Sequence, residues 1–326
     1  MIEMRDAAAT ARPLVVIGAP SSAGSYAPGQ EKAPAALREA GLVELMRREG
    51  IQVDDRGDVP GFRWRADRAH PRAMHADVAA RVARATADEA GSAFARQSPV
   101  LVLGGDCTVE LGIVAAAVET GGSVGLVYID LDTDLNTPAS TTDGALDWMG
   151  VAHMLGIEGT VPALAEVGHR KPLLKPGQIL YFGHDNVTPP ERGIIDALGI
   201  AGIPLGAVRA DPEQAARRVL DGWARRFTHL LIHLDADVLD YLDFPLAENT
   251  RRNRGLRFDE LMAALRLLLL APNWAALTVC EVNPDHGEED GSTLRTFCAA
   301  LAQALARSRR LRAPELPDPA FSTSLR

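Results

Sequence analysis

The sequence predicts a three-layer α/β/α sandwich built on a mainly parallel, doubly wound sheet. Short apolar runs alternate along the chain with longer segments of helical periodicity, which is typical of βαβ units. The runs are rich in Val, Ile and Leu without polar alternation, as strands covered on both faces require. With 326 residues, 47% of them hydrophobic and 24% charged, the composition is that of a globular protein. We expect a single domain over 1–326, with a flexible tail at about 313–326.

The apolar runs predict six strands, at 13–18, 99–104, 124–130, 178–183, 229–235 and 276–282. Apolar residues three and four apart predict six helices, at 34–48, 75–96, 108–119, 211–226, 258–270 and 292–307. The stretch 54–72 is rich in proline, glycine and arginine, which is typical of a long surface connection. Ligands of open α/β sheets bind at the carboxyl ends of strands, so we expect the functional residues there.

Charge and cysteine content exclude several classes of function. The 34 basic and 43 acidic residues leave a net charge of −9, which provides no basic field for nucleic acid or an anionic membrane. The 3 cysteines are an odd and sparse set, as in proteins of reducing compartments. The apolar stretch near the amino end is too short for a signal peptide or a membrane span. We therefore expect a cytoplasmic protein that acts on a small molecule or a protein partner.

Two of the expected strands end in aspartates whose alternate positions point their side chains one way. These are Asp130, Asp132 and Asp134 after one strand, and Asp235 and Asp237, followed by Asp240 and Asp243, after the other. Crowded carboxylates repel one another unless a cation lies between them. Divalent metal is the simplest such cation, and two ions can share bridging carboxylates about 3.5–4 Å apart. The alternative is that these aspartates only cap helices or contact solvent.

Cys107 follows two glycines at the end of another expected strand. The glycines allow a tight turn, and Cys107 would lie at the amino end of a helix, where a thiolate is favoured and could bind metal. A buried structural cysteine is the alternative, and it is the interpretation we adopt for Cys280 and Cys298. His233 shares a strand face with Asp235 and is a further candidate ligand, with a satisfied core histidine as the alternative.

Several motifs, in chain order, resemble those of the ureohydrolase superfamily of arginases and agmatinases. They are IGAPSSAGSYAPGQEKAPAALREAGL near the amino end, DRGDVP at 55–60, LGGDC at 103–107, IDLDTDLNTP at 129–138, HLDADVLD at 233–240 and CEVNP at 280–284. The resemblance covers most of the chain. It implies an arginase-like domain with a binuclear manganese centre, in which a metal-bridging hydroxide hydrolyses a linear C–N bond of a guanidino or amidino compound. It also implies a homo-oligomer, as a trimer or hexamer.

The resemblance implies a set of metal ligands, Asp130, Asp134, Asp235 and Asp237. Asp130 and Asp235 would bridge two ions, whereas Cys107 and Asp132 stand where the family has histidines. The added negative charge would raise the pKa of a bound water. A thiolate ligand also favours softer ions, so Zn²⁺, Fe²⁺ and Ni²⁺ are alternatives to Mn²⁺.

The resemblance also implies residues on the substrate side. Glu281 would receive the guanidinium through paired hydrogen bonds, and Asp147 would carry a proton. Asn136 and Thr188 would contact the far end of the substrate, although Thr188 replaces an aspartate of the family. The loop residues expected around the mouth are Trp148, Glu248, Asn249, Arg251, Arg252 and Arg254. The candidate proton shuttles are His153, His184 and His286.

The predicted function is metal-dependent hydrolysis of a guanidino or amidino compound. The loss of both histidines motivates an alternative, a catalytically silent ureohydrolase-like protein that serves in binding or assembly. A third hypothesis is a mononuclear metal enzyme in which the Cys107 side is vacant.

Overall fold

The computed structural model describes residues 12–251 and 253–310, so the tail expected at 313–326 lies outside the described residues. Its centre is a single sheet of eight parallel strands in the order β2-β1-β3-β8-β7-β4-β5-β6. The strands are β1 (Leu14–Ala19), β2 (Val53–Asp58), β3 (Val100–Gly104), β4 (Val124–Ile129), β5 (Ile179–Phe182), β6 (Ala201–Ile203), β7 (His229–Asp235) and β8 (Trp274–Cys280).

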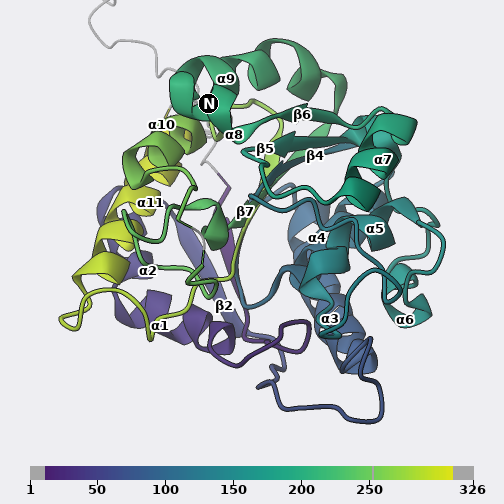
Figure 1. Cartoon of the computed structure of the whole chain (residues 1–326). Helices are drawn as coiled ribbons and strands as arrows, with labels where there is room; N and C mark the ends of the chain where they lie inside the picture. Colours follow the sequence, from purple (N-terminus) through teal and green to yellow (C-terminus); the bar gives the residue numbers. More distant parts are fainter. Residues whose placement is uncertain (1–11, 252, 311–326) are drawn as a thin grey trace, which may run out of the picture.

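Helices cover both faces of this sheet (Figure 1). One face carries α1 (Ala33–Glu39), α2 (Leu42–Arg48), α8 (Leu205–Ala210), α9 (Pro212–Arg218), α10 (Phe258–Leu268) and α11 (Ser292–Arg310). The other carries α3 (Ala76–Ala95), α4 (Glu110–Glu119), α5 (Gly150–Leu155), α6 (Pro162–Ala165) and α7 (Pro189–Leu198). The predicted three-layer α/β/α class is confirmed. Among the described residues, no helix combines the length and the apolar character that crossing a bilayer demands.

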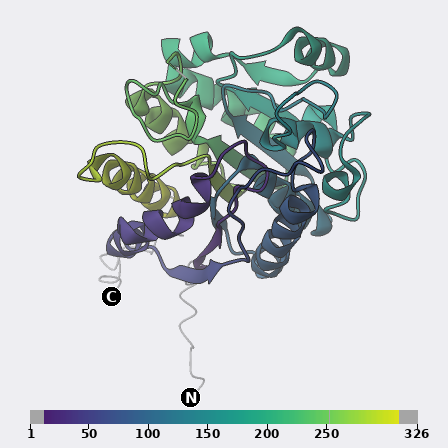
Figure 2. The same ribbon diagram turned by 60° about the horizontal axis from the view of Figure 1, so that its bottom comes forward.

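The core forms two layers, one on each side of the sheet. Leu14 and Val16 of β1 pack against the α1 and α11 side, whereas Val15 and Ile17 pack against the α3 side, because successive strand residues point to opposite faces. Figure 2 shows α11 beside α1 and α2. Burial on both faces explains why the inner strands are apolar without alternation.

The sequence patterns miss the two edge strands, β2 and β6. Part of the stretch expected as a surface connection is in fact a strand, since β2 begins at Val53 and pairs with β1. Its sequence is charged, and ion pairs help to hold it: Arg38 Nε and Nη2 each lie 2.9 Å from a carboxylate oxygen of Asp55. An edge strand has one neighbour and is partly exposed, so it does not need an apolar run.

One predicted helix is wrong in its continuity. The segment 34–48 forms two helices, α1 and α2, which separate at Gly41, where φ is 87°. A left-handed residue of this kind ends a helix at little cost only when it is glycine.

Candidate metal and substrate site

The four central strands, β3, β8, β7 and β4, are neighbours in the sheet, and all end at the same edge. Each delivers one polar side chain at that edge. Cys107 follows β3, Glu281 follows β8, Asp235 ends β7 and Asp130 follows β4. Segments far apart in the sequence therefore converge because parallel strands present their carboxyl ends together.

These side chains line a small, strongly acidic cavity. Its acidic lining residues are Asp130, Asp132, Asp134, Asp147, Asp235, Asp237, Glu248 and Glu281. Of the described residues, no lysine or arginine lines it. The cavity has a volume of about 30 Å³, enough for a pair of water-sized occupants, since one water needs roughly 10–15 Å³ by this measure. The space suits small ions and the reacting group of a substrate, but not a whole substrate.

The tightest carboxylate group is formed by Asp130, Asp235 and Asp237, each with one oxygen within 4.8 Å of the others. Burial and the charge of Asp235 raise the pKa of Asp130 well above its usual range. The pKa of Asp235 is likewise raised, by burial and by the charges of Asp237 and Glu281. Buried oxygen donors that destabilise one another are the donor set that a divalent cation neutralises. The residues present therefore fit the binuclear centre that the sequence predicts.

Asp134 and Asp132 lie in the same cavity but are held differently. Asp134 adopts φ 49°, an uncommon conformation for a non-glycine residue, and the Tyr128 hydroxyl donates to its carboxylate. Asp132 accepts a hydrogen bond from the Asn186 side-chain amide. The orientation of Asp134 is therefore fixed by a residue of β4, whereas Asp132 is hydrogen-bonded to the loop that follows β5.

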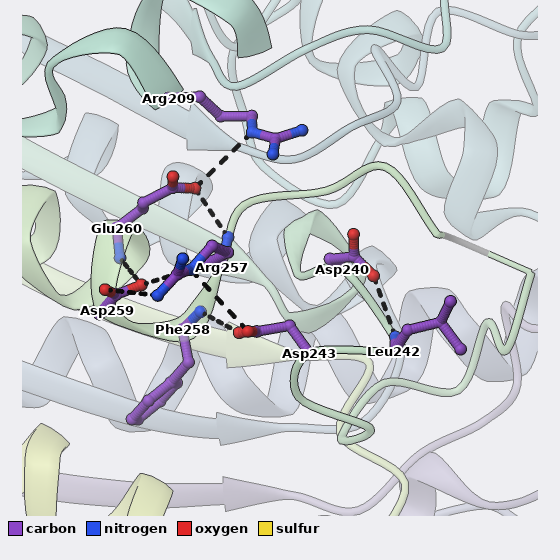
Figure 3. A network of polar contacts seen from close by, with 8 residues as sticks. All are labelled: Arg209, Asp240, Leu242, Asp243, Arg257, Phe258, Asp259 and Glu260. Atoms are coloured by element: carbon purple, nitrogen blue, oxygen red, sulfur yellow. Dashed lines mark hydrogen bonds and ion pairs between the residues drawn. The ribbon is translucent and has the colours of Figure 1, made fainter.

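Asp240 and Asp243 do not join the carboxylate group. Figure 3 shows both in the segment between β7 and α10. Asp240 accepts from the Leu242 amide at 3.0 Å, and Asp243 accepts from the Phe258 amide at 2.8 Å and lies 3.9 Å from Arg257. The contacts of these two aspartates therefore support the alternative to metal binding: Asp240 orders a loop, and Asp243 caps the start of α10.

Cys107 begins a short helical turn before α4, as expected, and is 1% exposed. Its Sγ lies 3.0 Å from Asp235 Oδ2. The expectation of a favoured thiolate is wrong for the metal-free protein, because burial, together with the nearby charges of Asp235 and Glu281, raises the pKa of the thiol well above its usual range. The desolvation that the sequence does not reveal outweighs the effect of the turn's amino end.

Glu281 lies at the base of the cavity with φ 59°. One carboxylate oxygen accepts from the Cys107 backbone amide at 3.1 Å, and the other accepts from Gln30 Nε2 at 2.8 Å. Burial, followed by the charge of Asp147, raises its pKa well above the usual range. A buried carboxylate with fixed orientation is well suited to accept hydrogen bonds from a planar cation. Gln30, which positions it, was missed because a single glutamine in a loop carries no sequence signal.

Asn136 and Thr188 meet at a residue that the sequence analysis did not single out, Glu191. Asn136 Nδ2 donates to Glu191 Oε1 at 3.0 Å, and the Thr188 hydroxyl donates to Glu191 Oε2 at 2.7 Å as it caps α7. Among the described residues that line the acidic cavity, neither is present. Their predicted contact with substrate stays a prediction, and the observed contacts favour a structural role.

A wider pocket of about 530 Å³ shares Tyr26, Trp148, Glu248 and Asn249 with the acidic cavity. Arg251 and His286 also line it, so part of the predicted mouth is in place, while Arg252 lies outside the described residues. Tyr26 was missed by the sequence analysis, and burial together with the charge of Glu248 raises the pKa of its hydroxyl. The small acidic cavity therefore adjoins a wider pocket that is large enough for a small molecule.

None of the three histidines proposed as proton shuttles lines the acidic cavity. His153 accepts from the Val161 amide at 3.1 Å through Nε2, and its Nδ1 lies 2.6 Å from the Met149 carbonyl oxygen. His184 packs against Tyr181 with the ring centroids 5.8 Å apart. Only His286 lines the wider pocket.

A family model described as "Arginase family" matches residues 12–306. The chain belongs to the arginase family. Arginase-1 of Rattus norvegicus is 30% identical over 312 residues, which cover 90% of this chain and 92% of the relative. The arginase of Bacillus caldovelox superposes with a TM-score of 0.80 at 25% identity, covering 90% of this chain and 98% of the other. Formimidoylglutamase from Bacillus subtilis shares the fold, with a TM-score of 0.70 at 18% identity over 94% of this chain and 89% of the other.

Proposed function

We propose that this arginase-family protein is a metal-dependent hydrolase that cleaves a linear C–N bond in a guanidino or amidino compound. The observation that carries the proposal is the group formed by Asp130, Asp235 and Asp237, three buried residues of the acidic cavity whose oxygens lie within 4.8 Å of one another. Curated relatives named arginase match over nine-tenths of the chain, which supports the same class of reaction.

The proposed ligands of two divalent ions are Asp130, Asp134, Asp235 and Asp237, with Cys107 and Asp132 beside them. Mn²⁺ is the ion we expect, with Zn²⁺, Fe²⁺ or Ni²⁺ as alternatives. When bound, such ions supply Lewis acidity and make a water more acidic. The chain's own residues contribute orientation, because Tyr128 fixes Asp134 and the Asp132 amide donates to Asp130 Oδ1 at 2.7 Å.

Glu281 is proposed to receive the cationic end of the substrate. Its two oxygens already accept from Gln30 and Cys107, and each retains a lone pair for a planar N–H donor. Asp147 also lines the cavity, and burial and the charge of Asp106 raise its pKa well above the usual range. A carboxyl group whose pKa is raised keeps its proton to a higher pH than an exposed one, which suits it to pass that proton to a leaving amine.

The remainder of the substrate is proposed to occupy the wider pocket. Its lining mixes Glu248 and Asp143 with Arg251, so a zwitterionic tail would find partners of both signs. A substrate with a guanidino group at one end and a charged tail at the other therefore fits the two connected spaces.

The silent binding protein is the second candidate. One observation favours it: the Asn186 side-chain amide donates a hydrogen bond to Asp132, a residue that the family resemblance implies as a metal ligand. Metal analysis separates the candidates, because an enzyme of this design holds about two ions per chain and a silent form holds none or one.

The deciding experiment incubates the purified full chain with each of the four divalent ions and measures urea and ammonia release from a panel of guanidino and amidino compounds. Asp237→Asn should abolish release, whereas the matched control Asp240→Asn, only three positions along but bonded to the Leu242 amide, should retain it. Absence of release with every ion and every compound would refute the enzymatic proposal.

We also propose that residues 1–326 form one domain that assembles into a cytoplasmic homo-trimer or homo-hexamer, as the family resemblance implies. Light scattering coupled to size-exclusion chromatography measures the assembly number, and a monomer at micromolar concentration would contradict it.

A further inference from the structure

Next to the carboxylate group, in contact with Asp235 through Cys107, lies a second cluster of donors, Cys107, His233 and Cys280. One ligand atom from each lies within 4.8 Å of the others. All three are buried, with exposures of 1%, 0% and 0%. His233 lies in β7, Cys280 ends β8 and Cys107 follows β3, and β8 adjoins both of the other strands. From sequence alone, Cys280 is interpreted as a core residue, and both readings of His233 stay open.

The His233 ring is held so that one nitrogen faces the thiols. Its Nδ1 lies 3.3 Å from Glu110 Oε2, and its Nε2 lies 3.3 Å from Cys107 Sγ. The Tyr128 ring stacks on it with centroids 4.2 Å apart and planes at 13°. When Nδ1 carries the proton and donates to Glu110, the Nε2 lone pair points at the sulfur. A histidine that ligates metal is usually held in this way, by a carboxylate on its other nitrogen.

Glu110 needs an explanation of its own. It is 0% exposed, and its Oε1 has no hydrogen-bond partner among the described residues. An unsatisfied buried carboxylate oxygen is costly and rare. A cation on the far side of His233 would make the imidazole N–H a stronger donor and would offset the charge of Glu110 through the ring.

Space for the second sulfur is provided by Gly104. A Cβ built at this position would lie 2.6 Å from Cys280 Sγ, so any side chain there would push the sulfur away. The glycine that ends β3 thus allows the thiol of β8 to approach Cys107.

We propose that Cys107, Cys280 and His233 form a binding site for Zn²⁺, which leaves the fourth position of the tetrahedron for a water. Zinc binds thiolate and imidazole at about 2.3 Å and about 2.0–2.1 Å in tetrahedral geometry, so neighbouring sulfur and nitrogen ligands lie about 3.6 Å apart. The observed separation between Cys107 Sγ and His233 Nε2, 3.3 Å, needs to widen by only a few tenths of an ångström.

Charge also favours zinc at this depth. Two thiolates and a neutral imidazole together balance the charge of a divalent cation, and binding releases the two thiol protons to solvent. Cys107 Sγ lies 3.0 Å from Asp235 Oδ2, so the sulfur cluster adjoins the carboxylate group. Cys107 also lies beside the proposed binuclear centre, so the two sites differ in His233 and Cys280, whose softer donors favour zinc over Mn²⁺.

The test is X-ray absorption spectroscopy at the zinc edge on the full chain loaded with one equivalent of Zn²⁺. Two sulfur scatterers at about 2.3 Å are expected, with nitrogen or oxygen at about 2.0–2.1 Å. Cys280→Ser should reduce the count to one sulfur and weaken zinc binding at least about tenfold, measured by competition with a chromogenic chelator. Cys298→Ser is the matched control, because Cys298 is equally buried but lies on α11, 3.7 Å from the Leu37 carbonyl oxygen.

A wild-type spectrum with oxygen and nitrogen scatterers alone would overturn the site, even if Cys280→Ser failed to fold. Equal zinc affinity in folded Cys280→Ser and wild type would overturn it as well. Hydrolysis supported by Mn²⁺ is measured on the same preparations. Sulfur-bound zinc without any hydrolysis would refute the proposed function and leave this site standing, whereas hydrolysis without sulfur-bound zinc would do the reverse.

Discussion

The hydroxyl of Tyr128 links the fold of the sheet to the proposed metal centre, and its removal is a direct test of that link. Tyr128 lies in β4 with 0% exposure, and its hydroxyl donates to Asp134 Oδ2. Tyr128→Phe removes only the oxygen and keeps the ring that stacks on His233. The variant therefore changes the orientation of one proposed ligand without creating a large cavity.

The size of the effect follows from the type of hydrogen bond. A hydrogen bond to a charged group contributes about 1.5–3 kcal/mol, and about 1.4 kcal/mol corresponds to tenfold in affinity. Asp134 would then swing between orientations, so we expect Mn²⁺ to bind roughly tenfold to a hundredfold more weakly. Saturating Mn²⁺ should restore most of the hydrolysis rate, because no group that contacts the substrate is changed.

The assay is calorimetric titration of the metal-free protein with Mn²⁺, together with the Mn²⁺ dependence of urea or ammonia release. Tyr181→Phe is the matched control: Tyr181 lies on the neighbouring strand β5, is 1% exposed, and donates to the Thr133 carbonyl oxygen at 2.6 Å rather than to a proposed ligand. Unchanged Mn²⁺ affinity in Tyr128→Phe, or an equal loss in Tyr181→Phe, would show that this hydroxyl does not position a metal ligand.

Three further outcomes are expected. Burial lowers the pKa of His153 to about 4, below the unfolded value of about 6.5, so its contribution to the free energy of unfolding is complete above pH 6.5 and declines by about 2 kcal/mol between pH 7 and pH 5. The free energy of unfolding from urea titrations should therefore fall by about 2 kcal/mol more in wild type than in His153→Gln over this pH range, and an equal fall in both proteins would count against it. Chelation should lower the Tm of the metal-loaded protein. Asp130→Asn should raise the Tm of the metal-free form, because it removes one of the carboxylates that repel one another; a lower Tm for metal-free Asp130→Asn than for metal-free wild type in calorimetry would contradict this. Gly105→Ala places a Cβ 1.8 Å from the Ser21 carbonyl oxygen and should lower the free energy of unfolding by about 3 kcal/mol or more. Gly91→Ala lies on α3, where a Cβ would meet no atom within 4 Å, and should raise the free energy of unfolding by about 0.5–1 kcal/mol; equal effects in chemical denaturation would refute the steric reasoning.

The inner strands and the acidic strand ends were predictable because they depend on local pattern. A strand buried on both faces must be apolar along its length, and 229–235 is such a run, observed as β7. The aspartates that follow it interrupt that pattern abruptly, so they stand out. The edge strand β2 has no such constraint, since Arg38 stabilises it from a separate helix, and the pattern of its own residues cannot report that contact.

The candidate site was predictable in its carboxylates but not in its supporting residues. Motif resemblance identified Asp130 and Asp235 by number, and the neighbouring order of their strands brings them together. Gln30 and Glu110 had no signal, because their contacts to Glu281 and His233 join residues more than a hundred positions apart. Glu191 did have a local signal, the capping box that it forms with Thr188, but its contact with Asn136 depends on the fold.

The order of residues alone determined a buried parallel sheet with anionic strand ends, because hydrophobic periodicity and charge are properties of neighbours along the chain. Tertiary structure alone decided which donors share a cavity and in what state they are held. Cys107 shows the difference: its position at a helix start favoured a thiolate, but its complete burial beside Asp235 reverses the preference. Desolvation and the charges of distant segments depend on three-dimensional distance, which linear order does not contain.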